Sequence, residues 1–199
     1  MKSTHNTFLN YFRPSIYLED FDKLNIFSLA NQGVRVLYCD LDNTLAPHFS
    51  HKPTQKAKDF LIRIKAQGIA IWVVSNNSKK RVKEFCVELL ADKIIDGFIA
   101  NAKKPLQYKI KRNMKKNNFS PEDAVVMGDQ LITDVLVANR LGCRSILVQP
   151  LMDVVYELKT GNQKFQYLIE KLVYKLEKNN FLNLTEVNQD FSGGANEIL

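Results

Sequence analysis

Between residues 36 and 45 the chain reads Val36-Leu37-Tyr38-Cys39-Asp40-Leu41-Asp42-Asn43-Thr44-Leu45, an apolar run that stops abruptly on two carboxylates one residue apart. The apolar part is typical of a buried strand. Two carboxylates placed so close together repel one another unless a cation compensates them, and Mg²⁺ prefers oxygen ligands of this kind. The segment therefore indicates a magnesium site. The alternative is that Asp42 and Asn43 only cap a turn after the strand, which is a common role for Asp and Asn.

Other polar residues stand at comparable places along the chain. Each follows an apolar run or precedes a helical pattern: Ser75 after residues 69–74, Lys104 before Pro105, and Asp129 with Asp134 after residues 124–127. The carboxyl ends of the strands in an open parallel sheet converge on one crevice. We therefore expect these side chains to share one site with the first two carboxylates, which favours the catalytic interpretation over the turn cap.

This set of residues resembles the four signatures of the haloacid dehalogenase (HAD) superfamily of phosphotransferases. Those signatures are an Asp-x-Asp motif, a Ser or Thr after the second strand, a Lys, and a Gly-Asp-x-x-x-x-Asp motif. They correspond in order to Asp40/Asp42, Ser75, Lys104 and Asp129/Asp134. The sequences Asp-Leu-Asp-Asn-Thr-Leu, Ser-Asn-Asn and Ala-Lys-Lys-Pro further resemble the YqeG branch of subfamily IIIA, which is related to mitochondrial phosphatidylglycerophosphate phosphatases. The resemblance covers residues 8–160.

The resemblance and the alternation of strand and helix patterns predict a three-layer, Rossmann-like α/β fold with a mostly parallel five-stranded sheet. The expected strands are residues 34–39, 69–74, 94–99, 124–127 and 145–148. The expected helices are residues 53–66, 78–90, 105–117 and 132–141. About 30 residues separate each of the first three motifs, which leaves no room for a cap domain.

Four regions follow from these patterns. Residues 1–33 are expected to be an N-terminal helical segment on the core, with a helix over 18–31, where apolar residues recur every third position. Residues 34–160 are the expected HAD-like core. Residues 161–178 predict a basic amphipathic helix, which either packs on its own domain or lies on an anionic membrane. Residues 179–199 are the expected flexible tail.

The resemblance also implies a role for each site residue. Asp40 is the nucleophile that forms an aspartyl-phosphate, and Asp42 is the general acid and base. Mg²⁺ is bound by the carboxylates of Asp40 and Asp129 and by the main-chain carbonyl of Asp42. Phosphate is bound by three residues: Ser75, Asn76 and Lys104. Two residues support the site without binding the metal directly: Thr44, which fixes the motif loop, and Asp134, which positions water or the lysine.

Net charge and spacing bear on the substrate. The chain carries a net charge of +7, with basic residues clustered over 79–83 and 103–116. Such clusters suit an anionic partner, or they are ordinary solvated helix faces. An uncapped site suits a substrate with its own bulk, so phosphatidylglycerophosphate is the first candidate. The alternatives are a soluble phosphomonoester, a nucleic-acid end, and a binding protein that kept the fold without catalysis.

Composition agrees with a single enzyme domain. A chain of 199 residues with 45% hydrophobic residues is long enough to bury one ample core. No apolar stretch is long enough to span a membrane, and no apolar region follows the N-terminal charge as in a secretory signal. The three cysteines have no metal-like spacing and are expected to be reduced core residues. We therefore expect a cytoplasmic protein, either free or peripheral at the inner face of the membrane.

Overall fold

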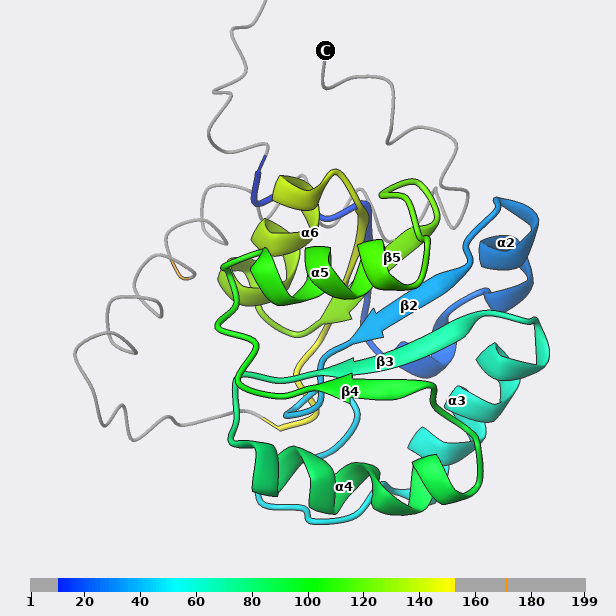
Figure 1. Cartoon of the computed structure of the whole chain (residues 1–199), viewed down its shortest axis with the longest axis vertical. Coiled ribbons are helices and arrows are strands. Elements are labelled where there is room, and N and C mark those ends of the chain that lie inside the picture. The colour runs from blue at the N-terminus through cyan, green and yellow to red at the C-terminus, as the bar shows by residue number, and fades with distance from the viewer. Residues whose placement is uncertain (1–10, 153–170, 172–199) are drawn as a thin grey trace, which may run out of the picture.

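A parallel β-sheet forms the centre of the computed structural model, which describes residues 11–152 and residue 171. The strands of this sheet are β1 (Ile16–Leu18), β2 (Val36–Cys39), β3 (Ala70–Val74), β4 (Gly97–Ile99), β5 (Ala124–Gly128) and β6 (Arg144–Val148). Their spatial order is β1-β6-β5-β2-β3-β4, and every neighbouring pair is parallel (Figure 1). The predicted parallel α/β architecture is confirmed, whereas the predicted number of strands was too small by one.

The additional strand is β1, which lies at the edge of the sheet beside β6. The continuous helix predicted over residues 18–31 is therefore wrong. The chain instead forms a 3₁₀ turn, η1 (Phe21–Lys23), and a short helix, α2 (Ile26–Asn31). Asp20 and Asn25 accept hydrogen bonds from the main-chain amides of Asp22 and Ser28, so each caps a new element and interrupts a longer helix.

The remaining helices follow the sequence pattern closely. They are α3 (Gln55–Ala66), α4 (Lys79–Ala91), α5 (Tyr108–Lys116) and α6 (Leu136–Leu141), the last preceded by the π-helical turn η2 (Leu131–Val135). Thr54 and Ser78 cap α3 and α4 by accepting from main-chain amides three residues later. Neither interval between the first three motifs holds an added domain, because α3 and β3 fill the first and α4 and β4 fill the second.

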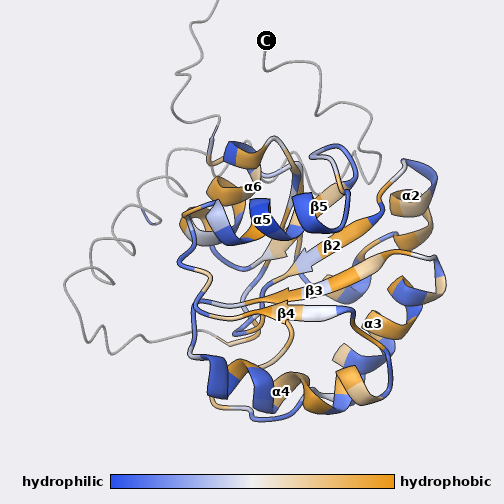
Figure 2. Ribbon diagram, viewed as in Figure 1, coloured by the Kyte–Doolittle hydropathy of each residue, from blue (hydrophilic) through white to orange (hydrophobic). Residues whose placement is uncertain are grey.

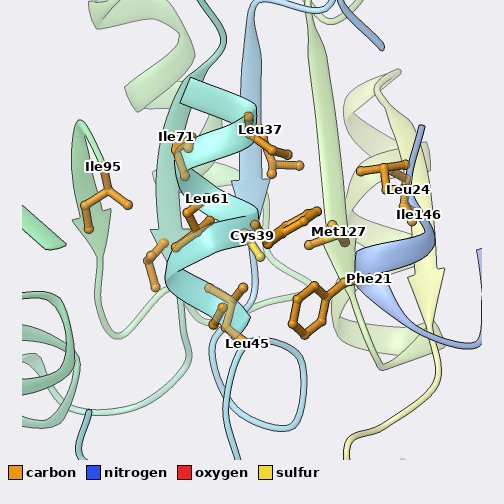
Figure 3. Close-up of a cluster of buried hydrophobic side chains, with 14 of the residues drawn as sticks. Phe21, Leu24, Leu37, Cys39, Leu45, Leu61, Ile71, Ile95, Met127 and Ile146 are labelled. Carbon is orange, nitrogen blue, oxygen red and sulfur yellow. The ribbon is translucent and has the colours of Figure 1, made fainter. Parts of the chain in front are cut away.

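Two apolar layers bury the sheet between the helices (Figure 2). On one face, alternate residues of β2, β3 and β5 pack with η1, α2, α3 and α4. Figure 3 shows part of this cluster, which includes Leu37 and Cys39 of β2 and Met127 of β5. The opposite face of the same strands packs against α5 and α6. This alternation is the period-2 pattern that a strand buried on both sides requires.

Three sequence expectations concern features around this core. Cys39, Cys86 and Cys143 are buried and free, as predicted. Within residues 11–152, no helix is both long and apolar enough to cross a membrane. The helix predicted over 161–178 and the tail predicted over 179–199 lie outside the described residues, apart from Lys171.

Candidate active site

The residues predicted to share a site come together at the carboxyl ends of the central strands. Asp40 directly follows β2, and Asp129 directly follows the neighbouring strand β5. The main-chain amide of Asp40 donates to the carbonyl of Met127 at 2.8 Å, so the pairing of the two strands continues up to the first acid. Ser75 follows β3 on the other side of β2. The sheet alone thus brings three of the predicted residues to one edge.

A buried lysine joins two of the carboxylates. Lys104 is only 6% exposed, and its ammonium group donates to Oδ1 of Asp40 at 2.5 Å and to Oδ1 of Asp134. The neighbouring Lys103 is exposed, which agrees with the choice of Lys104 from the position of Pro105. A buried ion pair of this kind stabilises a fold only when its remaining hydrogen bonds are made.

Asp134 makes those additional hydrogen bonds. It is 1% exposed, and its Oδ2 accepts from the main-chain amide of Gln130 and from the hydroxyl of Thr133, both at 3.2 Å. A Cβ atom at Gly128 would lie 2.2 Å from Cγ of Asp134, so the backbone of β5 approaches this carboxylate closely enough to exclude any side chain. These contacts engage both carboxylate oxygens, which fits a residue that orients Lys104.

The carboxylate cluster has an acceptor set that suits a divalent cation. One carboxylate oxygen from each of Asp40, Asp129 and Asp134 lies within 4.8 Å of the other two. Carboxylate oxygens are the ligands that Mg²⁺ and similar hard cations prefer. Lys104, the amide of Gln130 and the hydroxyl of Thr133 already bind both carboxylate oxygens of Asp134. The two acids that fit a direct metal contact are therefore Asp40 and Asp129.

The charges of this cluster are incompletely compensated. Burial raises the pKa of Asp40 to about 7, with the Lys104 ammonium opposing the rise and the Asp134 carboxylate adding to it. Burial also raises the pKa of Asp129 well above its usual range, reinforced by Asp40 and Asp134. For Lys104 burial acts against the charged form, but Asp134 and Asp40 outweigh it and raise the pKa of the ammonium group. One lysine therefore does not neutralise the acids, and a cation between Asp40 and Asp129 would.

Thr44 lies between the two candidate metal ligands. Its hydroxyl is fully buried and is placed to donate to Oδ2 of Asp40 at 3.4 Å or to Oδ1 of Asp129 at 3.3 Å. A hydroxyl has one proton, so it can serve only one of these acceptors at a time. The loop that carries it is folded by Asn43, whose amide donates to the carbonyl of Ala46 at 2.7 Å. Thr44 therefore holds the first motif against the third.

The second acid of the motif, Asp42, turns toward the end of β3. Its Oδ2 accepts from the hydroxyl of Ser75 at 3.2 Å and from the side-chain amide of Asn77 at 2.8 Å. Its Oδ1 accepts from Nη2 of Arg81 at 3.1 Å. Asn77 and Arg81 were not singled out as site residues in the sequence. The available signal was their position after Ser75 in the Ser-Asn-Asn motif and the first turn of α4.

Asn76 and Lys104 fix their two loops to one another. The main-chain amide of Lys104 donates to Oδ1 of Asn76 at 2.7 Å, and Nδ2 of Asn76 donates to the carbonyl of Lys104 at 3.1 Å. This reciprocal pair explains how a lysine beyond β4 is aligned with the strand ends. The structure thus brings all the predicted site residues together, in two groups: Thr44, Lys104, Asp129 and Asp134 around Asp40, with Asn76 bonded to the main chain of Lys104, and Ser75 beside Asp42.

Comparison with known proteins agrees with this geometry. Residues 4–152 match the family model described as mitochondrial PGP phosphatase. The chain is 34% identical over 140 residues to the probable phosphatase YqeG of Bacillus subtilis strain 168, covering 70% of this chain and 78% of that protein.

One of the solved structures that this chain resembles has a TM-score above 0.5 and so shares the fold. An uncharacterized protein from Listeria monocytogenes serotype 4b has a TM-score of 0.51 and 17% identity, over 71% of this chain and 99% of that one. A predicted HAD-like family hydrolase from Porphyromonas gingivalis has a TM-score of 0.46 and 11% identity, over 62% of this chain and 95% of that one. From the family model and the relative from Bacillus subtilis, the chain belongs to the mitochondrial PGP phosphatase family, is similar to YqeG, and is a phosphoric monoester hydrolase.

Proposed function

We propose that this phosphatase uses Mg²⁺ to hydrolyse phosphatidylglycerophosphate to phosphatidylglycerol through an aspartyl-phosphate on Asp40. The observation that carries the catalytic part is the placement of Asp40. Its carboxylate lies at the end of a central strand, beside a buried ammonium group and within 4.8 Å of the Asp129 carboxylate. A nucleophile that must approach an anionic phosphoryl group needs this concentration of positive charge, supplied by lysine and metal together.

In the first step, an oxygen of Asp40 attacks phosphorus and the bond from phosphorus to the leaving alcohol breaks. Asp42 enters this step as the carboxylic acid and gives its proton to the departing oxygen, so the alcohol leaves neutral and Asp42 is left as the carboxylate. Asp42 must turn away from Ser75 and Arg81 to reach that oxygen, since both now hold its carboxylate. General acid catalysis of this kind typically contributes about 10²–10⁴-fold to the rate.

In the second step, Asp42 takes a proton from a water molecule, whose oxygen attacks phosphorus. The bond between phosphorus and Asp40 breaks, inorganic phosphate is released, and both carboxyl groups return to their starting states. The two acids therefore exchange no role: Asp40 is always the covalent group, and Asp42 always carries the proton.

Mg²⁺ is the proposed cation of the carboxylate cluster. Its ligands would be the carboxylates of Asp40 and Asp129 and the main-chain carbonyl of Asp42, and it would neutralise charge on the phosphoryl oxygens and hold them in line with the nucleophile. Asp134 stays outside this set and keeps Lys104 directed at Asp40.

The phosphoryl oxygens would be held by Ser75, the main-chain amide of Asn76 and the ammonium group of Lys104. Ser75 now donates its hydroxyl to Asp42, so phosphate binding exchanges one anionic acceptor for another. Lys104 already contacts Asp40, and it can bridge the nucleophile and the phosphoryl group without moving far. A fixed ammonium group retains its effect as charge develops in the transition state.

The lipid assignment is supported by the family match and by the absence of a cap domain between the motifs. An uncapped site admits a phosphate on a bulky carrier, and the positive charge of the chain favours an anionic surface. We therefore propose a cytoplasmic enzyme that meets its substrate at the inner face of the membrane.

Release of inorganic phosphate from matched esters tests this proposal. The wild-type chain with Mg²⁺ is assayed on phosphatidylglycerophosphate in mixed micelles, on sugar phosphates and on 5′-phosphorylated oligonucleotides. Preferred turnover of the lipid is expected. Strong turnover of a sugar phosphate with none of the lipid would refute the lipid assignment. Asp40→Asn should abolish turnover of every substrate, and survival of activity in that variant would refute Asp40 as the nucleophile.

A further inference from the structure

Arg81 holds the side chain that the proposed reaction uses as its acid. Its Nη2 donates to Oδ1 of Asp42 at 3.1 Å and to the main-chain carbonyl of His48 at 3.3 Å. The side chain is 15% exposed, and the guanidinium lies 5.8 Å from the ring centroid of Phe85 on the same helix. The guanidinium is therefore fixed on three sides, by the acid, by the loop after the first motif and by α4.

This arrangement leaves donor capacity in the guanidinium. Arginine has five N–H donors, and both contacts to Asp42 and His48 use Nη2. Nη1 is buried and has no hydrogen-bond partner among the described residues. Guanidinium groups bind carboxylates and phosphates through two parallel N–H groups, so Nη1 and Nη2 can hold an anion together once the Asp42 carboxylate has moved away from Nη2.

The position of Asp42 fixes which part of a substrate meets that face. A general acid must lie within hydrogen-bond reach of the leaving-group oxygen. Two side chains assigned to different parts of the substrate hold this acid: Ser75, on Oδ2, is assigned to the phosphoryl oxygens, which leaves Arg81, on Oδ1, to border the leaving alcohol. Lys104 and Asp40 mark the phosphoryl side, whereas the hydrogen bonds of Arg81 go to Asp42 and to the carbonyl of His48.

Catalysis also deprives Arg81 of its anionic acceptor. When Asp42 turns to the leaving oxygen, its contact with Nη2 is lost, and a largely buried guanidinium remains beside the alcohol. A charged donor left without an acceptor is costly to maintain. An anionic oxygen on the alcohol itself would replace the lost carboxylate at that moment.

We propose that Arg81 forms a subsite for a second anionic group carried by the leaving alcohol. The inference rests on the proposed function, because it takes Asp42 as the general acid. The substrate class is then a phosphomonoester whose alcohol bears a further phosphate, either a lipid phosphodiester or a soluble bisphosphate. Arg81 acts here as a specificity-determining residue, and Asn77 keeps the second oxygen of Asp42 in place while the subsite is empty.

Three substrates separate charge on the alcohol from lipid bulk. Glycerol 3-phosphate has a neutral leaving alcohol, 1,3-bisphosphoglycerol adds a second phosphate, and phosphatidylglycerophosphate in mixed micelles adds both a phosphodiester and acyl chains. The measured quantity is kcat/KM of the full chain with Mg²⁺ for each substrate. The wild type should prefer both doubly anionic substrates over glycerol 3-phosphate. Arg81→Gln should lower each preference ratio about ten- to hundredfold, the value of one charged hydrogen bond.

Two further variants control for charge and for folding. Lys80→Gln removes a positive charge from the adjacent exposed residue of α4 and should change the ratios less than about threefold. Arg81→Lys keeps the charge without the forked donors and should retain part of the preference. The values of kcat/KM for two substrates are compared within each variant. A loss of folded protein therefore lowers both values equally and leaves their ratio unchanged.

The outcomes distinguish this inference from the function on which it rests. The subsite would be overturned if Arg81→Gln left the preference for the doubly anionic substrates over glycerol 3-phosphate unchanged. It would also be overturned if Lys80→Gln lowered that preference as much as Arg81→Gln does. A preference for the lipid alone, with the bisphosphate handled like glycerol 3-phosphate, would also overturn it, because acyl chains would then set specificity. If the wild type hydrolyses none of the three esters, the proposed function itself fails and the subsite with it.

Discussion

Asp129→Asn should make the metal-free protein more stable at pH 8, although it removes a site residue. The carboxylate oxygens of Asp129, Asp40 and Asp134 lie within 4.8 Å of one another, and Lys104 supplies one positive charge. At that separation and an effective dielectric of about 20, two like charges repel by about 3 kcal/mol. After allowance for the lysine, removal of one charge should raise the free energy of unfolding by about 1–3 kcal/mol. This corresponds to a melting temperature higher by roughly 2–12 °C.

The pH dependence follows from the direction of the pKa shifts. The pKa of Asp129 is raised well above its ordinary 3.8, and that of Asp40 is raised to about 7. An acid that is harder to ionise in the folded chain destabilises the fold as soon as the pH exceeds its ordinary pKa. The penalty is complete above the pKa of the folded state. The difference between the variant and the wild type should therefore be largest at pH 8 and should become small below about pH 3.5.

Differential scanning calorimetry in EDTA at pH 8 and pH 3.5, followed by titration with Mg²⁺ at pH 8, measures both effects. Mg²⁺ should raise the melting temperature of the wild type and leave the variant nearly unchanged. Asp59→Asn on the exposed side of α3 is the matched control. It should change neither the metal-free melting temperature nor the response of that temperature to Mg²⁺. An Asp129→Asn protein that melts below the wild type at pH 8 without metal would refute the argument, since the carboxylate would then be net stabilising.

Two other substitutions probe the same cluster. Lys104→Met leaves Asp40 and Asp134 buried without their cation, and we expect unfolding in urea at pH 8 to become easier by about 3–5 kcal/mol, with activity lost; a change under about 1 kcal/mol would contradict this. Gly128→Ala places a Cβ atom 2.2 Å from Cγ of Asp134, so we expect a loss of about 1–3 kcal/mol in thermal unfolding and at least a tenfold fall in kcat. Unchanged melting and kcat would show that Asp134 moves aside at no cost.

The sequence is informative about this site because the chain direction alone determines much of it. A residue that directly follows a parallel strand lies at the carboxyl edge of the sheet whatever its side chain does. Asp40, Ser75 and Asp129 could therefore be assigned to one edge from three apolar runs. Lys104 follows only a short strand, and its position relies on the reciprocal hydrogen bonds with Asn76, which spacing does not reveal.

The N-terminal strand could not be predicted for a different reason. β1 has three residues, too few to show the period of a strand, and it gains its stability from pairing with β6, about 130 residues away. Leu18, Phe21, Leu24 and Phe27 recur every third position and so imitate a helical face. Phe21 and Leu24 do pack on the core, but they do so from a 3₁₀ turn and the segment after it.

Arg81 shows why composition conceals specificity. Lys79, Lys80, Arg81 and Lys83 form one basic run, and in the structure three of these four residues are exposed, whereas the side chain of Arg81 is not. The phase of α4 makes the distinction. Ser78 caps the helix by accepting from the amide of Arg81, and Val82 and Phe85 must then face the core. That phase directs the third residue of the helix along the end of the sheet and onto Asp42. Apolar residues that carry no chemistry therefore select which of four similar cations contacts Asp42.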